Sequence, residues 1–148
     1  MIAPLDQNLV KQLQHKIDFK TKPTGALGQL EQIAMQIGLI QNTLTPTITA
    51  PHLIVFAGDH GLAKEGVSAY AQEVTHQMVL NFLGVGAAIN VFCRQHNIAL
   101  KVVDAGVNHD FGNLPALIHA KVDFGADSAL AGNAMSIDKA KAAVEKGK

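Results

Sequence analysis

The chain has few of the residues that mark secreted, membrane-bound or nucleic-acid-binding proteins. It has one cysteine, Cys93, and no tryptophan among 148 residues, which argues against a disulfide framework and fits a reducing compartment. Cys93 lies in an apolar helical context, which is typical of a buried structural thiol rather than a nucleophile. Only 16% of the residues are charged, with twelve acidic and twelve basic side chains. No net field therefore favours nucleic acid or an anionic membrane.

Long apolar runs and metal motifs are also missing. No apolar run approaches the roughly 20 residues that span a bilayer, and the N-terminus lacks the apolar core of a signal peptide. The seven histidines are scattered, without HExxH or CxxC spacing. We therefore expect a cytoplasmic protein that uses no metal and no cofactor and binds neither membrane nor nucleic acid.

What is present is enough apolar sequence for a real core, since 48% of the residues are hydrophobic. Apolar residues recur at helical spacing between Asp6 and Gln41, with a break at Lys22–Gly28 that contains proline and glycine. The Thr- and Pro-rich segment Asn42–Pro51 is typical of a linker. We therefore predict an N-terminal helical segment and linker over residues 1–50 and an α/β domain over residues 51–148.

The second part of the chain alternates strands and helices. The predicted elements are a strand His52–Ala57, a loop Gly58–Gln72, helices Glu73–Leu83 and Ala87–Gln95, strands Lys101–Asp104 and Ala116–Val122, and a helix Ile137–Lys146 capped by Ser136. Val74, Met78 and Phe82 are expected on one apolar side of the helix Glu73–Leu83. The continuous apolar character of the first strand predicts a parallel sheet covered on both faces. Two or three strands are few for such a sheet, so we also expect an uncovered apolar face and edge.

Acidic residues and glycines follow two of the predicted strands, where open α/β sheets bind their ligands. Asp59, His60 and Gly61 come directly after the first strand. They could form a substrate-facing pair, or Asp59 could hold a loop amide while His60 packs beneath the loop. Asp104 could likewise contact a ribose hydroxyl or stabilise a turn. A histidine-based hydrolase centred on Asp59 and His60 is the weakest option, because no nucleophile or metal partner stands at a recognisable spacing.

The loop Lys64–Thr75 contains Ser68 and Tyr70, the only tyrosine of the chain. An aromatic side chain with hydroxyl and amide neighbours suits a flat heteroaromatic ligand. The alternative is a surface loop before a helix with Glu73 in its first turn, where the helix dipole favours a carboxylate. Gly84-Val85-Gly86 resembles a phosphate-binding turn ahead of a helix. It follows a helix rather than a strand, however, which favours a packing role.

Several segments resemble one family in the same order. They are KPTGALGQLE (Lys22–Glu31), FAGDHGLAKEGVSAYAQEVTHQM (Phe56–Met78), GAAINV (Gly86–Val91), VVDAGV (Val102–Val107) and AMSIDKA (Ala134–Ala140). Together they are similar to nicotinate-nucleotide–dimethylbenzimidazole phosphoribosyltransferase, and the combination is more specific than any single Gly-rich motif. The departures are Ala26, where the family often has serine, and Ala71, where proline is usual.

The resemblance implies a fold and a reaction. The fold is a Rossmann-like parallel sheet, here partial, preceded by N-terminal helices of a small helical domain that both ends of the family's chain build. The family transfers phosphoribosyl from nicotinate mononucleotide to dimethylbenzimidazole, giving α-ribazole phosphate and nicotinate for the lower ligand of cobalamin. It is a homodimer with active sites near the subunit interface, and it requires no metal.

The resemblance also implies which half of the site this chain contains. The family's base is a glutamate that lies, with the nucleotide-binding loops, beyond the position of Lys148, so we expect no catalytic residue here. The residues expected to bind or shape the acceptor-base pocket are Asp59, His60, Gly61, Ser68, Tyr70, Gln77 and Met78. We expect the chain alone to be inactive. The alternative is a non-catalytic benzimidazole-binding or assembly module that needs a separate C-terminal half.

Overall fold

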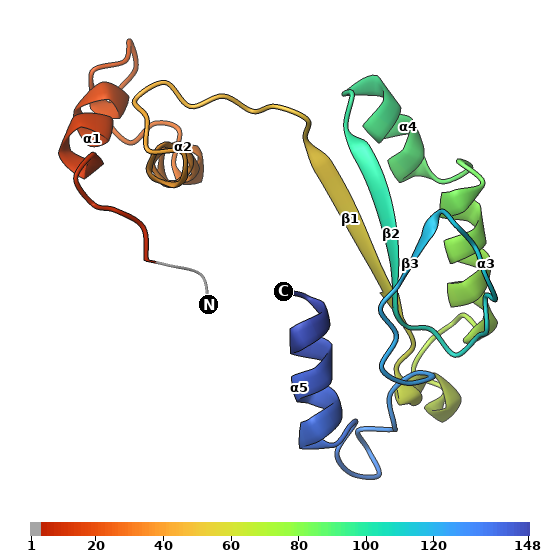
Figure 1. The fold of residues 1–148 in the computed structure, drawn as a ribbon. Helices are drawn as coiled ribbons and strands as arrows, with labels where there is room; N and C mark the ends of the chain where they lie inside the picture. Colours follow the sequence, from red (N-terminus) through yellow and green to blue (C-terminus); the bar gives the residue numbers. More distant parts are fainter. Residues whose placement is uncertain (1–3) are drawn as a thin grey trace. The chain divides into compact units, whose positions relative to one another are not determined.

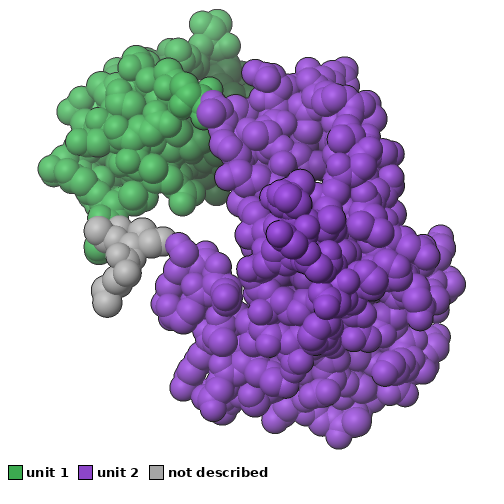
Figure 2. Space-filling model, turned by 45° about the vertical axis from the view of Figure 1, so that its right-hand side comes forward, with its two compact units in different colours: residues 1–49 green, residues 50–148 purple. Residues whose placement is uncertain are grey.

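The computed structural model describes residues 4–148, which fall into two compact units that divide between Thr49 and Ala50 (Figure 2). The first unit contains two helices, α1 (Val10–Asp18) and α2 (Gln29–Ile40) (Figure 1). They pack closely because Leu13 is buried against Gly38, where an added Cβ would come within 2.6 Å of Leu13 Cδ2. The predicted break between the helices is confirmed.

An ion pair closes the connection between these two helices. Lys22 Nζ lies 2.8 Å from Glu31 Oε1, and the Leu27 amide donates to the same oxygen at 3.1 Å. The hydrogen bond from Lys22, with that from Leu27, holds the pKa of the Glu31 carboxyl below its usual value. The first and last residues of KPTGALGQLE are therefore structural partners in this unit.

The second unit is built on a three-stranded parallel sheet in the order β1 (His52–Gly58), β2 (Ala99–Gly106), β3 (Leu117–His119). The predicted α/β class with a parallel sheet is confirmed. The third strand is shorter than the predicted Ala116–Val122, because the chain after His119 leaves the sheet and Val122 lines a cavity at its edge.

Helices α3 (Glu73–Leu83) and α4 (Ala88–Gln95) connect β1 to β2, after a short 3-10 helix η1 (Gly61–Glu65) inside the predicted loop. The last helix, α5 (Ile137–Lys146), follows β3, and its cap is confirmed because Ser136 Oγ accepts a hydrogen bond from the Lys139 amide at 3.3 Å. The predicted limits of α3 and α5 are confirmed, and α4 begins one residue later than predicted.

The core lies between α3 and one face of the sheet. Val79 is fully buried and clusters with Ala57, Val102 and Leu117, while Phe82 packs against this cluster. The predicted apolar side of α3 was Val74, Met78 and Phe82. Of these three residues, only Phe82 packs against the core. The core side of α3 is centred on Val79, so the other core-facing positions lie three and four residues from it. The buried position of Cys93 on α4 is confirmed.

The opposite face of the sheet is open among the residues that the structure describes. Ile54, Phe56 and Ile118 point away from the α3 core, and their exposed fractions are 46%, 64% and 44%. The expectation that β1 is covered on both faces is therefore wrong for this part of the chain. The expectation of an uncovered apolar face, drawn from the small number of strands, is confirmed.

By length and composition the helical stretch Glu73–Gln95 is apolar enough to cross a membrane, with a mean hydropathy of 1.3. The stretch has no continuous apolar run in the sequence, because polar residues interrupt it. In the structure it forms two helices, separated at Gly84–Ala87, and Val79 and Cys93 are buried on its inner side. A core helix passes the same test of length and composition, so the match is weak evidence for a membrane span.

Candidate functional site

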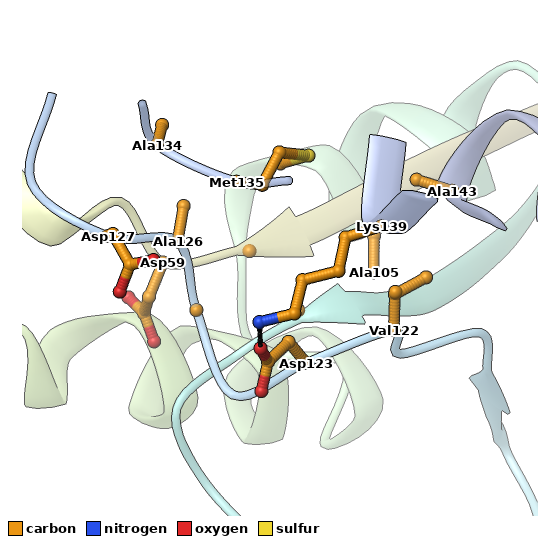
Figure 3. A pocket seen from close by; sticks show the side chains of 13 residues that line it. Asp59, Ala105, Val122, Asp123, Ala126, Asp127, Ala134, Met135, Lys139 and Ala143 are labelled. Atoms are coloured by element: carbon orange, nitrogen blue, oxygen red, sulfur yellow. Dashed lines mark hydrogen bonds and ion pairs between the residues drawn. The ribbon is translucent and has the colours of Figure 1, made fainter. Parts of the chain in front are cut away.

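A cavity of about 190 Å³ lies at the carboxyl ends of the strands (Figure 3). Its walls come from the ends of β1 and β2, from the loop that follows β3, and from α5. Gly58 contributes from the end of β1 and Asp59 from the residue that follows it, and Lys139 and Ala143 contribute from α5. This is the edge at which open α/β sheets bind ligands.

Asp59 connects three segments at this edge. Its amide donates to the Gly106 carbonyl at 2.9 Å, and its carbonyl accepts from the Ala126 amide at 2.9 Å. Its carboxylate oxygen Oδ2 accepts from the Asn108 amide at 2.8 Å. Of the two interpretations offered by the sequence, the geometry matches the one in which Asp59 holds a loop amide.

Gly61 and His60 differ in their surroundings. A Cβ added at Gly61 would lie 2.3 Å from the Asp127 carbonyl carbon and 2.4 Å from the Ser128 nitrogen. Gly61 therefore lets the 127–128 backbone approach η1, whereas the His60 side chain is exposed to solvent. The exposed position of His60 differs from the interpretation in which it packs beneath the loop.

Asp123 and Lys139 form an ion pair in the cavity (Figure 3). The Phe124 amide also donates to Asp123, at 2.8 Å. The hydrogen bond from Lys139, with that from Phe124, holds the pKa of the Asp123 carboxyl below its usual value. The same bond to Asp123 raises the pKa of the Lys139 ammonium.

Asp104 is buried, and both of its oxygens are used within the protein. Oδ1 accepts from the amides of Gly106 and Val107 at 3.1 and 2.9 Å, and Oδ2 lies 3.1 Å from Lys121 Nζ. These contacts agree with the turn-stabilising interpretation of Asp104 rather than a ribose contact. Lys121 Nζ also lies 4.1 Å from the ring centre of Phe124, a cation–π geometry that fixes the loop beyond β3.

The residues of the predicted base-binding loop and helix lie outside this cavity. Tyr70 is 74% exposed and Met78 38% exposed, and Ser68 and Gln77 are also on the surface. The Ser68 hydroxyl accepts from the Tyr70 amide at 3.1 Å, which orders the loop locally. The structure thus brings Asp59 to the cavity and Gly61 to its supporting loop, but does not enclose the other predicted residues in the same pocket.

The sequence interpretation missed Asp123, Asp127 and Lys139, which all line the cavity. Asp123 follows the predicted third strand directly, so the strand-end rule that selected Asp59 would also have selected it. Lys139 had no comparable signal, because a lysine near the start of a surface helix is usually solvated. Within residues 4–148, no three histidine, cysteine or carboxylate side chains come together as a metal site.

Comparisons with known proteins identify the family. A family model described as phosphoribosyltransferase matches residues 2–148. Nicotinate-nucleotide–dimethylbenzimidazole phosphoribosyltransferases of Aromatoleum aromaticum and Dechloromonas aromatica are 53% and 56% identical, over 97% and 96% of this chain. The chain spans only 42% and 41% of their lengths.

A solved structure agrees with the sequence relatives. The crystal structure of the enzyme of this name from Thermus thermophilus superposes with a TM-score of 0.83 at 40% identity, and the match covers 97% of this chain and 43% of that one. The chain therefore belongs to the nicotinate-nucleotide–dimethylbenzimidazole phosphoribosyltransferase family.

Proposed function

We propose that this chain supplies the acceptor-base side of a phosphoribosyltransferase that moves phosphoribosyl from nicotinate mononucleotide to dimethylbenzimidazole. The family match over residues 2–148 is the observation on which this proposal rests. The segment Phe56–Met78, one of those that resemble the family, contains the end of β1 at the ligand-binding edge of the sheet. The reaction would give α-ribazole phosphate and nicotinate.

Within this proposal, Tyr70 offers a stacking face for the benzimidazole, and Ser68, Gln77 and Met78 contact its edges. The high exposure of Tyr70 and Met78 fits side chains whose ligand contacts are not replaced by protein contacts. Asp59, His60 and Gly61 would shape the floor, with Asp59 and Gly61 acting through the loops that they hold.

The charges of the cavity bear on the donor substrate. The residues that line the cavity include three carboxylates, those of Asp59, Asp123 and Asp127, and one ammonium, that of Lys139, which pairs with Asp123. Such a site repels the phosphate of nicotinate mononucleotide. Its volume of about 190 Å³ is also below the roughly 300 Å³ at which ligand pockets usually begin. We therefore assign the donor nucleotide to polypeptide beyond these residues, and the family resemblance implies that the base that takes the benzimidazole N–H proton lies there too.

Isothermal titration of the purified chain with each substrate tests the proposal. We expect measurable binding of dimethylbenzimidazole and none of nicotinate mononucleotide. Tyr70→Ala should weaken dimethylbenzimidazole binding about tenfold, the effect of losing one aromatic stacking partner. Phe92→Ala removes another exposed aromatic ring, on α4, and should leave binding unchanged. Tight binding of both substrates, or equal effects of both substitutions, would contradict the proposal.

The alternative is a non-catalytic module that holds a benzimidazole until a separate C-terminal half binds. The chain spans 42% of the Aromatoleum aromaticum relative, and in this alternative the remaining length is a separate polypeptide. We further propose that the functional assembly is a cytoplasmic homodimer that binds neither membrane nor nucleic acid. Light scattering of the assembled protein would give twice the mass of one copy, and a monomer would overturn the homodimer.

A further inference from the structure

Two histidine rings stack between α3 and the loop that follows β2. The ring centres of His76 and His109 lie 4.4 Å apart, and the ring planes are 13° from parallel. His76 is the fourth residue of α3, and both side chains are partly buried. A metal ion would require ring nitrogens that point to a common centre, whereas these rings present their faces to each other. The contact is therefore an aromatic stack rather than part of a metal site.

His109 is the fixed partner of this stack. Its ring meets the ring of Phe111 edge-on, with the centres 4.8 Å apart, and Phe111 belongs to the buried core. The His109 carbonyl accepts a hydrogen bond from Lys121 Nζ at 2.5 Å. The amide of the preceding Asn108 donates to the Asp59 carboxylate at 2.8 Å. These three contacts hold the loop, so His109 presents a rigid surface to α3.

The start of α3 depends on this surface. Gln72 precedes the helix, and its side chain makes no capping hydrogen bond to the described residues. Met78 is 38% exposed, whereas Val79 is fully buried. His76 lies three residues before Val79 and therefore on the same side of the helix. Its stack on His109 anchors the first turns of α3 to the loop after β2.

The stack responds to protons because both rings can become charged. Histidine gains its charge between about pH 8 and about pH 5. One proton leaves a cation facing a neutral ring, which is an attractive contact, whereas two protons place like charges 4.4 Å apart. At this distance the repulsion of two unit charges disfavours the second proton about fivefold, even at the dielectric constant of water.

The charged groups around the stack leave this repulsion in place. Glu73, one turn before the stacked histidine of α3, and Asp110 in the loop are exposed, so water screens both carboxylates. After β3, the Lys121 ammonium lies at the loop carbonyl and adds a positive charge, which the buried Asp104 carboxylate pairs with at 3.1 Å. The stack is therefore most stable while at least one of its rings is neutral.

We propose that the His76–His109 stack is a positioning contact that holds the base-binding side of α3 in place, and that the second proton on the pair releases it. Gln77 and Met78 follow His76 directly on the helix, so a loosened first turn displaces both. The connection to benzimidazole binding rests on the proposed function, whereas the proton sensitivity of the stack does not.

Urea unfolding at two pH values tests the proton sensitivity. Unfolding frees both histidines to take up protons near pH ~6.5, whereas the folded pair resists the second proton, so this part of the stability is present above that pH and is lost below it. Between about pH 7.5 and about pH 5.5, the unfolding equilibrium constant should rise at least about threefold more in the unaltered chain than in His76→Phe, which keeps a flat ring without a proton site.

His96→Phe is the matched control, because His96 is exposed at the C-terminal end of α4. A protonated histidine at a helix C-terminus is stabilising, so this variant should keep at least the acid loss of the unaltered chain. His109→Phe should give the same result as His76→Phe and replaces it if circular dichroism shows that His76→Phe fails to fold. Equal acid losses in the unaltered chain and in both stack variants would overturn the proton sensitivity.

Titration with dimethylbenzimidazole at about pH 8, where histidines are neutral, tests the positioning role. His76→Ala should weaken binding about fivefold, the contribution of one aromatic pair, and should speed hydrogen exchange of the amides in the first turns of α3. His76→Phe should restore both to within about twofold of the unaltered chain, because it restores the stack.

The outcomes separate this inference from the proposed function. If the unaltered chain binds no dimethylbenzimidazole, the proposed function fails, and hydrogen exchange alone decides whether the stack anchors α3. If the unaltered chain binds and His76→Ala binds equally well, the positioning role is overturned. Unchanged exchange of the α3 amides in His76→Ala would overturn the anchor itself.

Discussion

At the scale of single residues, the Asp123–Lys139 ion pair stabilises the folded protein over a limited range of pH. The lowered pKa of Asp123 means that its stabilising effect is present above the unfolded value, about 3.9, and is lost as the pH falls through the folded value. The raised pKa of Lys139 means that its effect is present below the unfolded value, about 10.4, and is lost as the pH rises through the folded value. The pair therefore acts across the neutral range.

Lys139→Gln should raise the pKa of the Asp123 carboxyl toward its ordinary value, because the largest cause of the lowering is removed. A carboxyl-carbon NMR titration measures this directly, and added salt should shrink the difference because the pair is about half exposed. Lys141→Gln, on the same helix, is the control and should leave Asp123 unchanged. An Asp123 titration that does not respond to Lys139→Gln would show that the pair does not persist in solution.

Val85 is a residue whose backbone conflicts with its side chain. Its φ is +63°, a region that costs a β-branched residue roughly 1–2 kcal/mol. The conformation closes the C-terminal end of α3, where the Gly86 amide donates to the Asn81 carbonyl at 3.0 Å, a position usually held by glycine.

Val85→Gly should therefore raise the free energy of unfolding by about 1 kcal/mol, since strain is removed and the 52%-exposed side chain loses little burial. Urea unfolding measures the change. Val67→Gly, at a 61%-exposed loop position without positive φ, is the matched control and should be neutral or destabilising. A loss of stability for Val85→Gly as large as for the control would mean that the turn has relaxed.

At the scale of elements, the contact between η1 and the loop after β3 depends on Gly61. Gly61→Ala should destabilise the protein by at least about 2 kcal/mol, because the new methyl group meets rigid backbone at 2.3 Å. Gly132→Ala is the control, because nothing lies within 4 Å of its added Cβ. Thermal unfolding compares the two variants, and similar melting temperatures would refute the close approach.

Asp104 connects β2 to the segment after β3 in the same way that Asp59 connects β1 to β2. Asp104→Ala should cost about 3 kcal/mol, because the Lys121 ammonium loses its charged partner and keeps the neutral His109 carbonyl. The Gly106 and Val107 amides also lose their acceptor. The exposed Asp110 caps only the Gly112 amide, and Asp110→Ala should cost about 1 kcal/mol or less. Denaturant unfolding measures the stability of both variants. A small effect of Asp104→Ala would mean that water replaces Asp104 as the partner of the Lys121 ammonium.

At the scale of the whole molecule, the chain has an open sheet face and a cavity of about 190 Å³, which is smaller than usual ligand pockets and is not assigned to the donor nucleotide. We expect the purified chain to form no α-ribazole phosphate from nicotinate mononucleotide and dimethylbenzimidazole, because the residues assigned to the donor and the base lie outside it. Product analysis by chromatography, with an intact relative as the positive control, measures this. Turnover that Tyr70→Ala reduces would overturn the expectation of an inactive chain.

Much of the architecture could be predicted from local pattern. The limits of α3 and α5, the Ser136 cap and the parallel strands follow from periodicity, capping chemistry and apolar runs, all of which act between near neighbours in sequence. The predictions failed where contacts between segments distant in sequence determine the structure. Val79 rather than Met78 faces the core, and β3 ends at His119, because the sheet and the cavity select those positions.

The family and the α/β alternation can be assigned from the amino-acid sequence, since both depend on the order and spacing of residue types. The folded structure is needed to assign the roles of Asp59 and Gly61, which depend on Asn108 and Asp127, far along the chain. It also decided that Asp123 and Lys139 meet in the cavity and that Phe56 lies on an open face. The physical reason is that a hydrogen bond, an ion pair or burial requires a partner in space, and folding brings those partners together from separate segments.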